Sequence, residues 1–220
     1  MYIIFIMNEH NINVANQYNL ISNSFDNSRV RIWNNVKQFL NTKNNNEELL
    51  DCGCGNGKNM IYANKIGYVT EGFDISDNLL DICRQKNLNV FYHDVLDLKL
   101  TQKYDKIIAI AILHHLKSVE EQILSINNLL DCLKDGGTLL VSFWSKEKNF
   151  NNNEYSKNAV DYRDFKVGPN IVDWKLDKNN TAKRFYYIHD YDSIINLVNK
   201  VNHKYIIYWE MQNWFIIFYK

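Results

Sequence analysis

The sequence has no excess of charge of either sign and no apolar run long enough to cross a membrane. Its 220 residues include 25 Lys and Arg and 25 Asp and Glu, so the formal net charge is zero. Any nucleic acid would therefore have to be bound by a local basic patch. The apolar start, MYIIFIMNEH, lacks a basic leader and is too short to span a bilayer. We expect translation to start at Met1 or Met7, and a soluble protein of the cytoplasm or the nucleus.

Cysteine and proline are also scarce. The four cysteines lie scattered in apolar stretches, with no second Cys or His pair at zinc-ligand spacing, so we expect reduced thiols and no metal site; they are Cys52, Cys54, Cys83 and Cys132. The single proline, Pro169, lies in a stretch from 146 to 182 that we expect to be rich in loops. Asparagine-rich tracts at 41–46 and 149–154 are predicted surface loops without an assigned function.

Strand-like and helix-like patterns alternate between residues 48 and 144. Five short apolar runs predict strands at 48–53, 68–74, 88–94, 104–115 and 138–144. The stretches between them predict helices at 59–67, 76–87 and 118–133. Ser76 is a candidate N-cap, Ser118 with Glu121 forms a candidate capping box, and Gly136-Gly137 is expected to stop the third helix. This alternation predicts an α/β domain around a parallel sheet with right-handed crossovers.

Further elements flank this core. The N-terminal segment 8–45 has apolar residues at helical spacing: Val30, Trp33, Val36, Phe39 and Leu40. A late helix is predicted over DYDSIINLVNKV (190–201), and a β-hairpin over 203–209 and 213–220. We therefore expect a single domain over residues 1–220, with a mostly parallel seven-stranded sheet, a C-terminal antiparallel hairpin and a variable segment at 146–190.

The stretch LLDCGCGNGK, residues 49–58, carries three of the eight glycines in one turn. It is not a P-loop, because Asn59 follows Lys58 in place of Ser or Thr, and Cys52 stands where the first glycine belongs. It fits a strand-to-helix turn that binds a nucleoside ligand. Glycines allow the ligand to approach the backbone closely, and the start of the next helix offers free N–H groups.

Two acids follow the glycine turn at the ends of the next two strands. Asp74 stands where an acid can bind ribose hydroxyls. Asp94 suits the exocyclic amine of adenine, and the neighbouring Val95 suits the face of its ring. The glycines have the spacing G-x-G-x-G after Asp51, and not the G-x-G-x-x-G of dinucleotide-binding proteins.

The D-x-G-x-G-x-G motif with both acids resembles that of class I S-adenosylmethionine (SAM) methyltransferases. The resemblance implies the Rossmann-like fold of that class and SAM as the cofactor. It also implies ten cofactor-binding residues: Asp51, Gly53, Gly55, Gly57, Lys58, Asp74, Ile75, Asp94, Val95 and Ala111.

Stretches along almost the whole chain resemble one family within that class, the eukaryotic tRNA wobble-uridine methyltransferases. They are YNLISNSFDNSRVRIWNNVKQFL, LLDCGCGNGKN, GFDISDNLLDICRQKNLNVFYHDVLDL, IAILHHLKSVEEQILSINNLLDCLKDGGTLLVSFWS, VDWKL, KRFYYIHDYDSI and NWFIIF. This family methyl-esterifies 5-carboxymethyluridine at position 34 of tRNA. The chain departs from the family at Ile32 and Asp173, where the family has proline before tryptophan, and in a short loop before the late helix. These departures concern the substrate side and not the cofactor side.

The resemblance implies that an ionised carboxylate attacks the methyl of a sulfonium. Such a carboxylate has a pKa of about 4, so no general base is needed, and alignment and desolvation are the expected sources of rate. Four residues are the candidate catalytic groups: Arg29 and Arg184 as carboxylate donors, His115 beside the acceptor, and Trp144 to stack the flipped base. Neighbours on a strand face opposite sides, so we expect His115 to face the site and His114 to pack inward.

Further substrate contacts and packing residues complete this interpretation. Arg31, Tyr187 and His189 are candidate substrate-binding residues, and Trp33, Tyr186 and Trp214 are expected to pack.

The resemblance also implies partners. The tRNA anticodon loop would meet basic residues: Lys37, Lys43, Lys175, Lys178, Lys183 and Arg184. The strand with Val90, Phe91 and Tyr92 would lie at a sheet edge and form a heterodimer by pairing with a small zinc-binding activator subunit. Two alternatives stay open: a SAM methyltransferase of a small molecule or protein, and a non-catalytic RNA-binding subunit with this fold. The intact glycine motif and Asp74 argue against the second.

Overall fold

The computed structural model describes residues 8–42, 46–147, 164–177 and 180–220. Met1, Met7, Lys43, Lys178 and the tract 149–154, about which the sequence led to predictions, lie outside the described residues.

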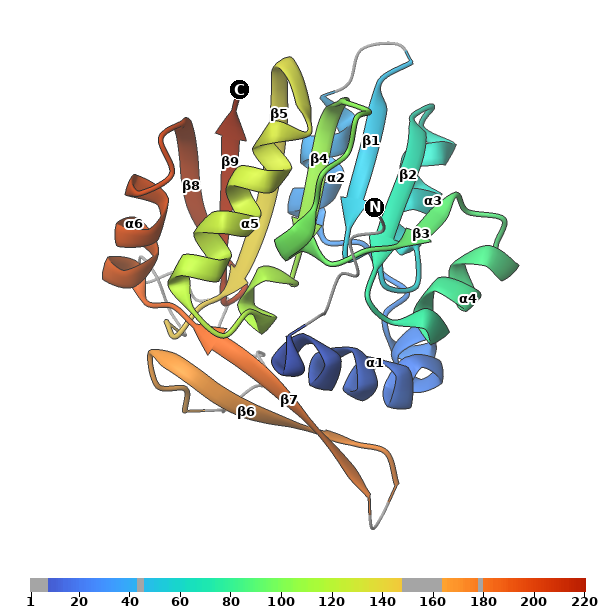
Figure 1. Ribbon diagram of the computed structural model, residues 1–220, viewed down its shortest axis with the longest axis vertical. Helices are drawn as coiled ribbons and strands as arrows, with labels where there is room; N and C mark the ends of the chain where they lie inside the picture. The colour runs from blue at the N-terminus through green and yellow to red at the C-terminus, as the bar shows by residue number, and fades with distance from the viewer. Residues whose placement is uncertain (1–7, 43–45, 148–163, 178–179) are drawn as a thin grey trace, which may run out of the picture.

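A seven-stranded sheet forms the centre of the molecule (Figure 1). Its strand order is β3-β2-β1-β4-β5-β9-β8. The strands are β1 (Glu48–Cys52), β2 (Val69–Asp74), β3 (Val90–Tyr92), β4 (Tyr104–Ile110), β5 (Leu133–Trp144), β8 (Lys204–Glu210) and β9 (Asn213–Tyr219). The first five pair in parallel, and β9 is antiparallel to both β5 and β8. The predicted parallel sheet and C-terminal hairpin are confirmed.

Helices cover both faces of the sheet because the central strands are apolar on both sides. In β1, Leu50 packs in the cluster formed with α5 (Val119–Asp131) and α6 (Tyr191–Asn199). Its neighbour Leu49 packs on the opposite face, with α2 (Asn34–Asn41) and α3 (Lys58–Lys65). The helix α4 (Asp77–Gln85) packs beside α3 through Leu80 and Cys83, and its predicted N-cap Ser76 accepts a hydrogen bond from the Leu79 amide.

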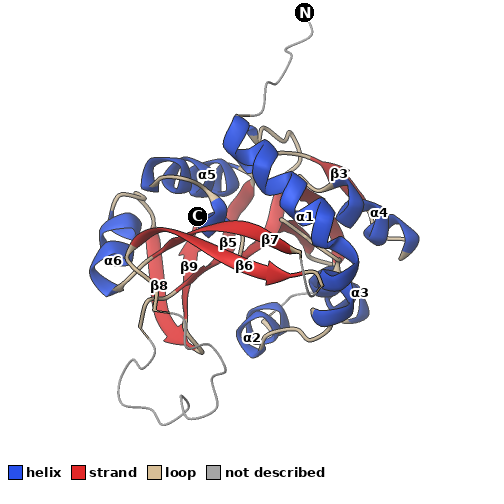
Figure 2. Cartoon of the chain, turned by 90° about the horizontal axis from the view of Figure 1, so that it is seen from below, coloured by secondary structure: helices blue, strands red, loops and turns tan. Residues whose placement is uncertain are grey.

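Two elements lie across the end of the sheet at which the parallel strands finish. They are the helix α1 (Glu9–Ser28) and a separate antiparallel pair, β6 (Gly168–Lys175) and β7 (Thr181–Ile188). Figure 2 shows both in front of the sheet edge when the molecule is seen from below. Since ligands of open α/β sheets bind beyond the carboxyl ends of the strands, these two elements enclose the expected site.

The predicted fourth strand, 104–115, is too long. The strand β4 ends at Ile110, because Ala111 has a left-handed φ of 59°. The chain then forms a 3-10 turn, η2 (Leu113–His115). The strand-alternation argument therefore does not apply to His114 and His115.

The predicted third helix, 118–133, was also too long. The helix α5 ends at Asp131, and Gly136-Gly137 lie within β5 and not at a helix stop. A Cβ on Gly137 would stand 2.9 Å from the Lys134 carbonyl oxygen and 3.0 Å from that of Asp105, so a close backbone approach inside the sheet explains this glycine. Only half of the predicted capping box forms. The Ser118 hydroxyl accepts a hydrogen bond from the Glu121 amide, but the Glu121 carboxylate accepts one from the Lys117 amide and not from the Ser118 amide.

Two further predictions at the periphery need correction. The stretch 146–182, expected to be loops, contains β6 and the start of β7, because alternating side chains of this pair bury one face against the rest of the molecule. The N-terminal helical pattern is split: Val30 lies between α1 and α2 and is 69% exposed, and Trp33 is the N-cap of α2.

All four cysteines are buried, and none of them forms a disulfide. Within the described ranges, the helices are too short or too polar for any of them to span a membrane.

Candidate active site

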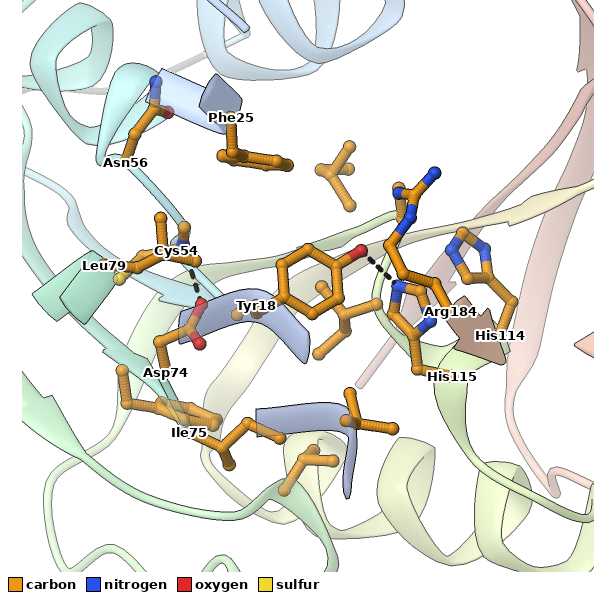
Figure 3. A pocket seen from close by; sticks show the side chains of 18 of the residues that line it. Tyr18, Phe25, Cys54, Asn56, Asp74, Ile75, Leu79, His114, His115 and Arg184 are labelled. Carbon is orange, nitrogen blue, oxygen red and sulfur yellow. Dashed lines mark hydrogen bonds between the residues drawn. The ribbon is translucent and has the colours of Figure 1, made fainter. Parts of the chain in front are cut away.

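A cavity lies between the carboxyl ends of the strands and the layer formed by α1 and β7 (Figure 3). The helix α1 contributes residues that recur at helical spacing to the wall: Asn11, Val14, Tyr18 and Phe25. The cavity is thus enclosed by the strand ends on one side and by α1 and β7 on the other.

The glycine turn forms one wall. Gly53, Gly55 and Gly57 have φ values of 65°, 56° and 76°, in the left-handed region that other residues avoid. At Gly53 the space is also closed, since a Cβ would stand 2.4 Å from Cγ2 of Ile112. After Gly57, α3 begins at Lys58, whose side chain lines the cavity and whose pKa is lowered by burial and by the nearby Arg29.

The acid that precedes the glycines lies behind the turn. Asp51 is 1% exposed, and neither carboxylate oxygen makes a hydrogen bond to a described residue. Burial and then the negative charge of Asp74 raise the pKa of Asp51 to about 8, against the opposing effects of Lys58 and Asn59. Such a group favours a cationic ligand beyond the turn, because a positive charge would compensate the buried carboxylate.

Asp74 lies on the cavity wall at the end of β2. Its two carboxylate oxygens accept hydrogen bonds from the amides of Gly55 and Ser76, both at 2.9 Å. Burial raises the pKa of Asp74, and these amides oppose the rise. Each oxygen keeps a lone pair for a ligand hydroxyl. The geometry fits the predicted contact with ribose.

The predicted adenine side lies next to Asp74. Ile75, Asp94 and Val95 line the cavity together. The Asp94 carboxylate accepts hydrogen bonds from the Leu96 amide at 3.0 Å and from the Asn11 side-chain amide of α1 at 2.6 Å. The Asn11 amide thus donates to the Asp94 carboxylate as the exocyclic amine of a bound adenine would.

Ala111 also lines the cavity, after β4. Its left-handed backbone is held by a hydrogen bond of 2.9 Å from its amide to Oγ of Ser142. The structure thus brings nine of the ten predicted cofactor-binding residues to the turn or the cavity wall and places Asp51 directly behind them, with Gly57 as the N-cap of α3.

Two arginines, one near the glycine turn and one on β7, lie on the same tryptophan. The guanidinium carbons of Arg29 and Arg184 lie 4.9 Å and 4.7 Å from the ring centroid of Trp174. Arg29 is exposed and Arg184 is buried, and both line the cavity. Arg184 donates to the Tyr186 hydroxyl at 2.6 Å, and its Nε has no hydrogen-bond partner among the described residues.

Trp144 lines the same cavity. Its ring stacks on Tyr186 with centroids 4.2 Å apart and planes 24° apart. We call the five residues Arg29, Trp144, Trp174, Arg184 and Tyr186 the arginine–tryptophan cluster. It combines flat aromatic surface with cationic donors, which suits a planar anionic group.

The two histidines of the 3-10 turn both line the cavity, and both are buried. The expectation that one would pack away from the site was wrong, because a tight turn does not alternate its side chains as a strand does. His114 packs on Tyr186, and burial lowers its pKa. His115 has both ring nitrogens engaged: Nε2 lies 2.8 Å from the Tyr18 hydroxyl, and Nδ1 2.7 Å from the Phe185 carbonyl oxygen.

Three predicted substrate-binding residues lie elsewhere. Arg31 is exposed and outside the cavity wall. Tyr187 is half-buried on the face of β7 opposite to Arg184 and Tyr186, since side chains alternate along a strand. His189 is 0% exposed and hydrogen-bonded to Gln122 and Ser193, and it therefore joins α5 to the start of α6.

Sequence reasoning missed several residues of the site. Tyr18, His114, Tyr186 and Asn11 line the cavity but were overlooked as site residues. Trp174, whose ring the two arginines contact, was overlooked as well. The helical spacing of Asn11, Val14 and Tyr18 could have indicated one face of a helix, but nothing local indicates which surface that face covers. Among the described residues, no group of three or more His, Cys, Asp or Glu is placed to hold a metal ion.

Comparisons with known proteins identify the family of this chain. Residues 26–202 match the family model described as "Methyltransferase domain".

Three curated relatives are named tRNA (carboxymethyluridine(34)-5-O)-methyltransferase. The Macaca fascicularis protein, ALKBH8, is 32% identical over 135 residues, which is 61% of this chain and 20% of that protein. The Arabidopsis thaliana protein is 33% identical over 132 residues (60% and 32%). The Saccharomyces cerevisiae protein is 33% identical over 141 residues (63% and 50%). The matched region thus spans a fifth to a half of the length of these relatives.

Solved structures share the fold at low sequence identity. The DhpI–SAM–HEP complex has a TM-score of 0.72 at 11% identity, with 97% of this chain and 99% of that chain covered. The CcbJ methyltransferase of Streptomyces caelestis has a TM-score of 0.70 at 12% identity, with 94% and 97% covered.

Proposed function

Because this chain belongs to the methyltransferase domain family, we propose that it transfers a methyl group from SAM to the carboxylate of 5-carboxymethyluridine at the tRNA wobble position. The observation that carries the substrate assignment is the arginine–tryptophan cluster, in which the buried Arg184 has an unpaired Nε at the cavity wall. The names of the relatives support the same acceptor.

The cofactor is SAM, and the wall residues fit each part of it. Asp94 and Val95 suit the adenine, Asp74 suits the ribose hydroxyls, and the start of α3 with the glycine turn suits the amino-acid end. Burial raises the pKa of Asp51 to about 8, and the cationic groups of SAM would favour its ionised form. When bound, SAM would supply an electrophilic methyl group to the carboxylate oxygen, and the electron pair of the broken carbon–sulfur bond would stay on sulfur.

The residues of the chain would orient the nucleophile and exclude water. Arg184 would offer its Nε, which has no partner among the described residues, to one carboxylate oxygen, while its NH1 donates to Tyr186. The carboxylate oxygen that accepts no hydrogen bond would keep its nucleophilicity. Arg29 at the exposed rim suits the phosphate or the second oxygen. No group has to remove a proton, because the carboxylate is ionised at neutral pH.

The aromatic residues of the cluster suit the base. The uracil ring presents a planar face that can stack on Trp144, which itself stacks on Tyr186. Outside the cavity, Lys175 and Lys183 are exposed on the β6–β7 pair and suit phosphates of the anticodon loop.

A protein partner belongs to the same proposal. The edge strand β3 pairs only with β2 within the described chain, and its Tyr92 is 46% exposed. Beside it, Ile12 and Tyr92 line a second hollow together with acidic residues such as Asp97. We propose that a small zinc-binding activator pairs with this edge and forms a heterodimer. The proposed location is the cytoplasm or the nucleus.

The test is methyl transfer from labelled SAM to two tRNA pools, with and without the activator. One pool carries carboxymethyluridine at the wobble position and the other lacks it. Label confined to the first pool, and released as a base-labile ester, would support the proposal. Label in both pools would point to another nucleotide. Label in neither pool, despite measurable SAM binding and with the activator present, would overturn it.

A further inference from the structure

The Tyr18 side chain lies at the middle of the cavity, between the cofactor wall and the acceptor wall. Figure 3 shows its ring between Asp74 on one side and His115 with Arg184 on the other. The residue comes from α1, and its ring packs edge-on against Phe25, with centroids 5.8 Å apart. In the proposed reaction, the methyl group of SAM moves from the cofactor side of the cavity to the acceptor carboxylate, and so passes through this region.

The hydrogen bonds around His115 fix the proton of the Tyr18 hydroxyl. The Phe185 carbonyl oxygen can only accept, so Nδ1 of His115 must carry the hydrogen in their 2.7 Å contact. Burial lowers the pKa of His115 to about 3, so at neutral pH the ring has no second proton. Nε2 is then an acceptor, and the Tyr18 hydroxyl, 2.8 Å away, must donate its only proton to it.

A neighbouring contact holds this arrangement in place. Nε2 of His10 donates to the His115 carbonyl oxygen at 2.7 Å, and the His10 ring packs edge-on against Phe185 at 4.6 Å. The turn that carries His115 is thus held from α1 and from β7, and the direction of the Tyr18 proton is set by residues of three elements.

The Tyr18 oxygen therefore presents only lone pairs to the cavity. An anionic carboxylate would be repelled by these lone pairs, whereas Arg184 offers it an N–H. The methyl of a sulfonium carries polarised C–H groups, which a fixed oxygen acceptor attracts.

We propose that the hydroxyl oxygen of Tyr18 contacts the transferring methyl group of SAM and holds it in line between sulfur and the acceptor carboxylate. Tyr18 is then a catalytic residue of this site. The inference rests on the proposed function only for the identity of the cofactor, and not for that of the acceptor.

Measuring the binding of SAM and of S-adenosylhomocysteine tests the role of Tyr18 without any methyl transfer. Tyr18→Phe keeps the ring and removes the oxygen. We expect calorimetry to show SAM affinity reduced by about twofold to fivefold, as for the loss of one C–H···O contact, with the affinity for S-adenosylhomocysteine, which lacks the methyl, unchanged. Tyr62→Phe is the matched control, because the Tyr62 hydroxyl bonds to Asn41 on the exposed side of α2 and α3.

A second measurement observes the methyl group of bound SAM by NMR. With SAM labelled with ¹³C at the methyl, the bound methyl proton resonance of the wild-type protein should lie downfield of its position in Tyr18→Phe, and that of Tyr62→Phe should match the wild type. Equal losses of affinity for both ligands would mean that Tyr18 only positions α1, and would overturn the proposal. Unchanged affinity and an unchanged methyl resonance would overturn it as well. If tRNA is not the acceptor, these outcomes are unaffected.

Discussion

Replacing Gly53 with alanine tests whether the glycine turn is required by backbone conformation, by space, or by both. Gly53 has φ of 65°, and an added Cβ would stand 2.4 Å from Cγ2 and 3.1 Å from Cβ of Ile112. Rotation about χ1 can move Cγ2 but not Cβ, so a change of rotamer would still leave Cβ of Ile112 in a tight contact at 3.1 Å. The backbone of the turn or of the Ala111-Ile112 segment would then have to shift slightly.

The magnitude follows from two separate costs. A left-handed backbone costs a residue with a Cβ roughly 1–2 kcal/mol. An overpacked contact costs roughly 1–3 kcal/mol more. We therefore expect Gly53→Ala to lower the free energy of unfolding by about 2–5 kcal/mol.

A matched control separates the two costs. Gly136 has φ of 78°, and a Cβ there would meet no atom within 4 Å. Gly136→Ala should therefore lose only the conformational part, about 1–2 kcal/mol. Urea denaturation, followed by circular dichroism and tryptophan fluorescence, measures both variants, provided that the slope of the transition is unchanged. Equal losses for the two variants would refute the steric argument at Gly53.

Three more predictions concern charged groups of the site. Asp74→Asn should lower SAM affinity at least about tenfold by calorimetry, because an amide cannot accept at both atoms. Arg184→Lys should lower kcat/KM for methyl transfer at least about tenfold with SAM affinity unchanged, because an ammonium replaces the planar fork that lies on Trp174. Asp51→Asn should flatten the pH dependence of stability without SAM. The pKa of Asp51 is about 8 when folded and roughly 4 when unfolded, so the folded state binds more protons between these values and wild-type stability falls as pH rises through them.

Each of these three predictions can be contradicted by a specific result. Arg84→Lys, on the exposed surface of α4, is the control for Arg184→Lys and should leave kcat/KM unchanged. If Arg184→Lys weakens SAM binding instead, Arg184 belongs to the cofactor and not to the acceptor. If Asp74→Asn binds SAM normally, the ribose lies elsewhere. If Asp51→Asn loses stability with pH as steeply as the wild type, the pKa of Asp51 is not raised.

The sequence by itself determined the sheet and the cofactor side. The glycine turn depends on backbone conformation alone, and the glycines at 53, 55 and 57 all have left-handed φ values. Asp74 and Asp94 follow parallel strands, whose carboxyl ends meet at one edge of the sheet, so their neighbourhood could be predicted from strand order alone.

Only the tertiary structure decided the acceptor side, because its contacts join residues far apart in the chain. The bond between His115 and Phe185 spans 70 residues, and that between Trp174 and Ser24 spans 150. No local pattern indicates that β6 and β7 pair across the cavity, that α1 places Tyr18 at its centre, or that His189 packs away from it. Local spacing sets the conformation of a turn, but the surface that each helix and hairpin covers depends on where the rest of the chain has packed.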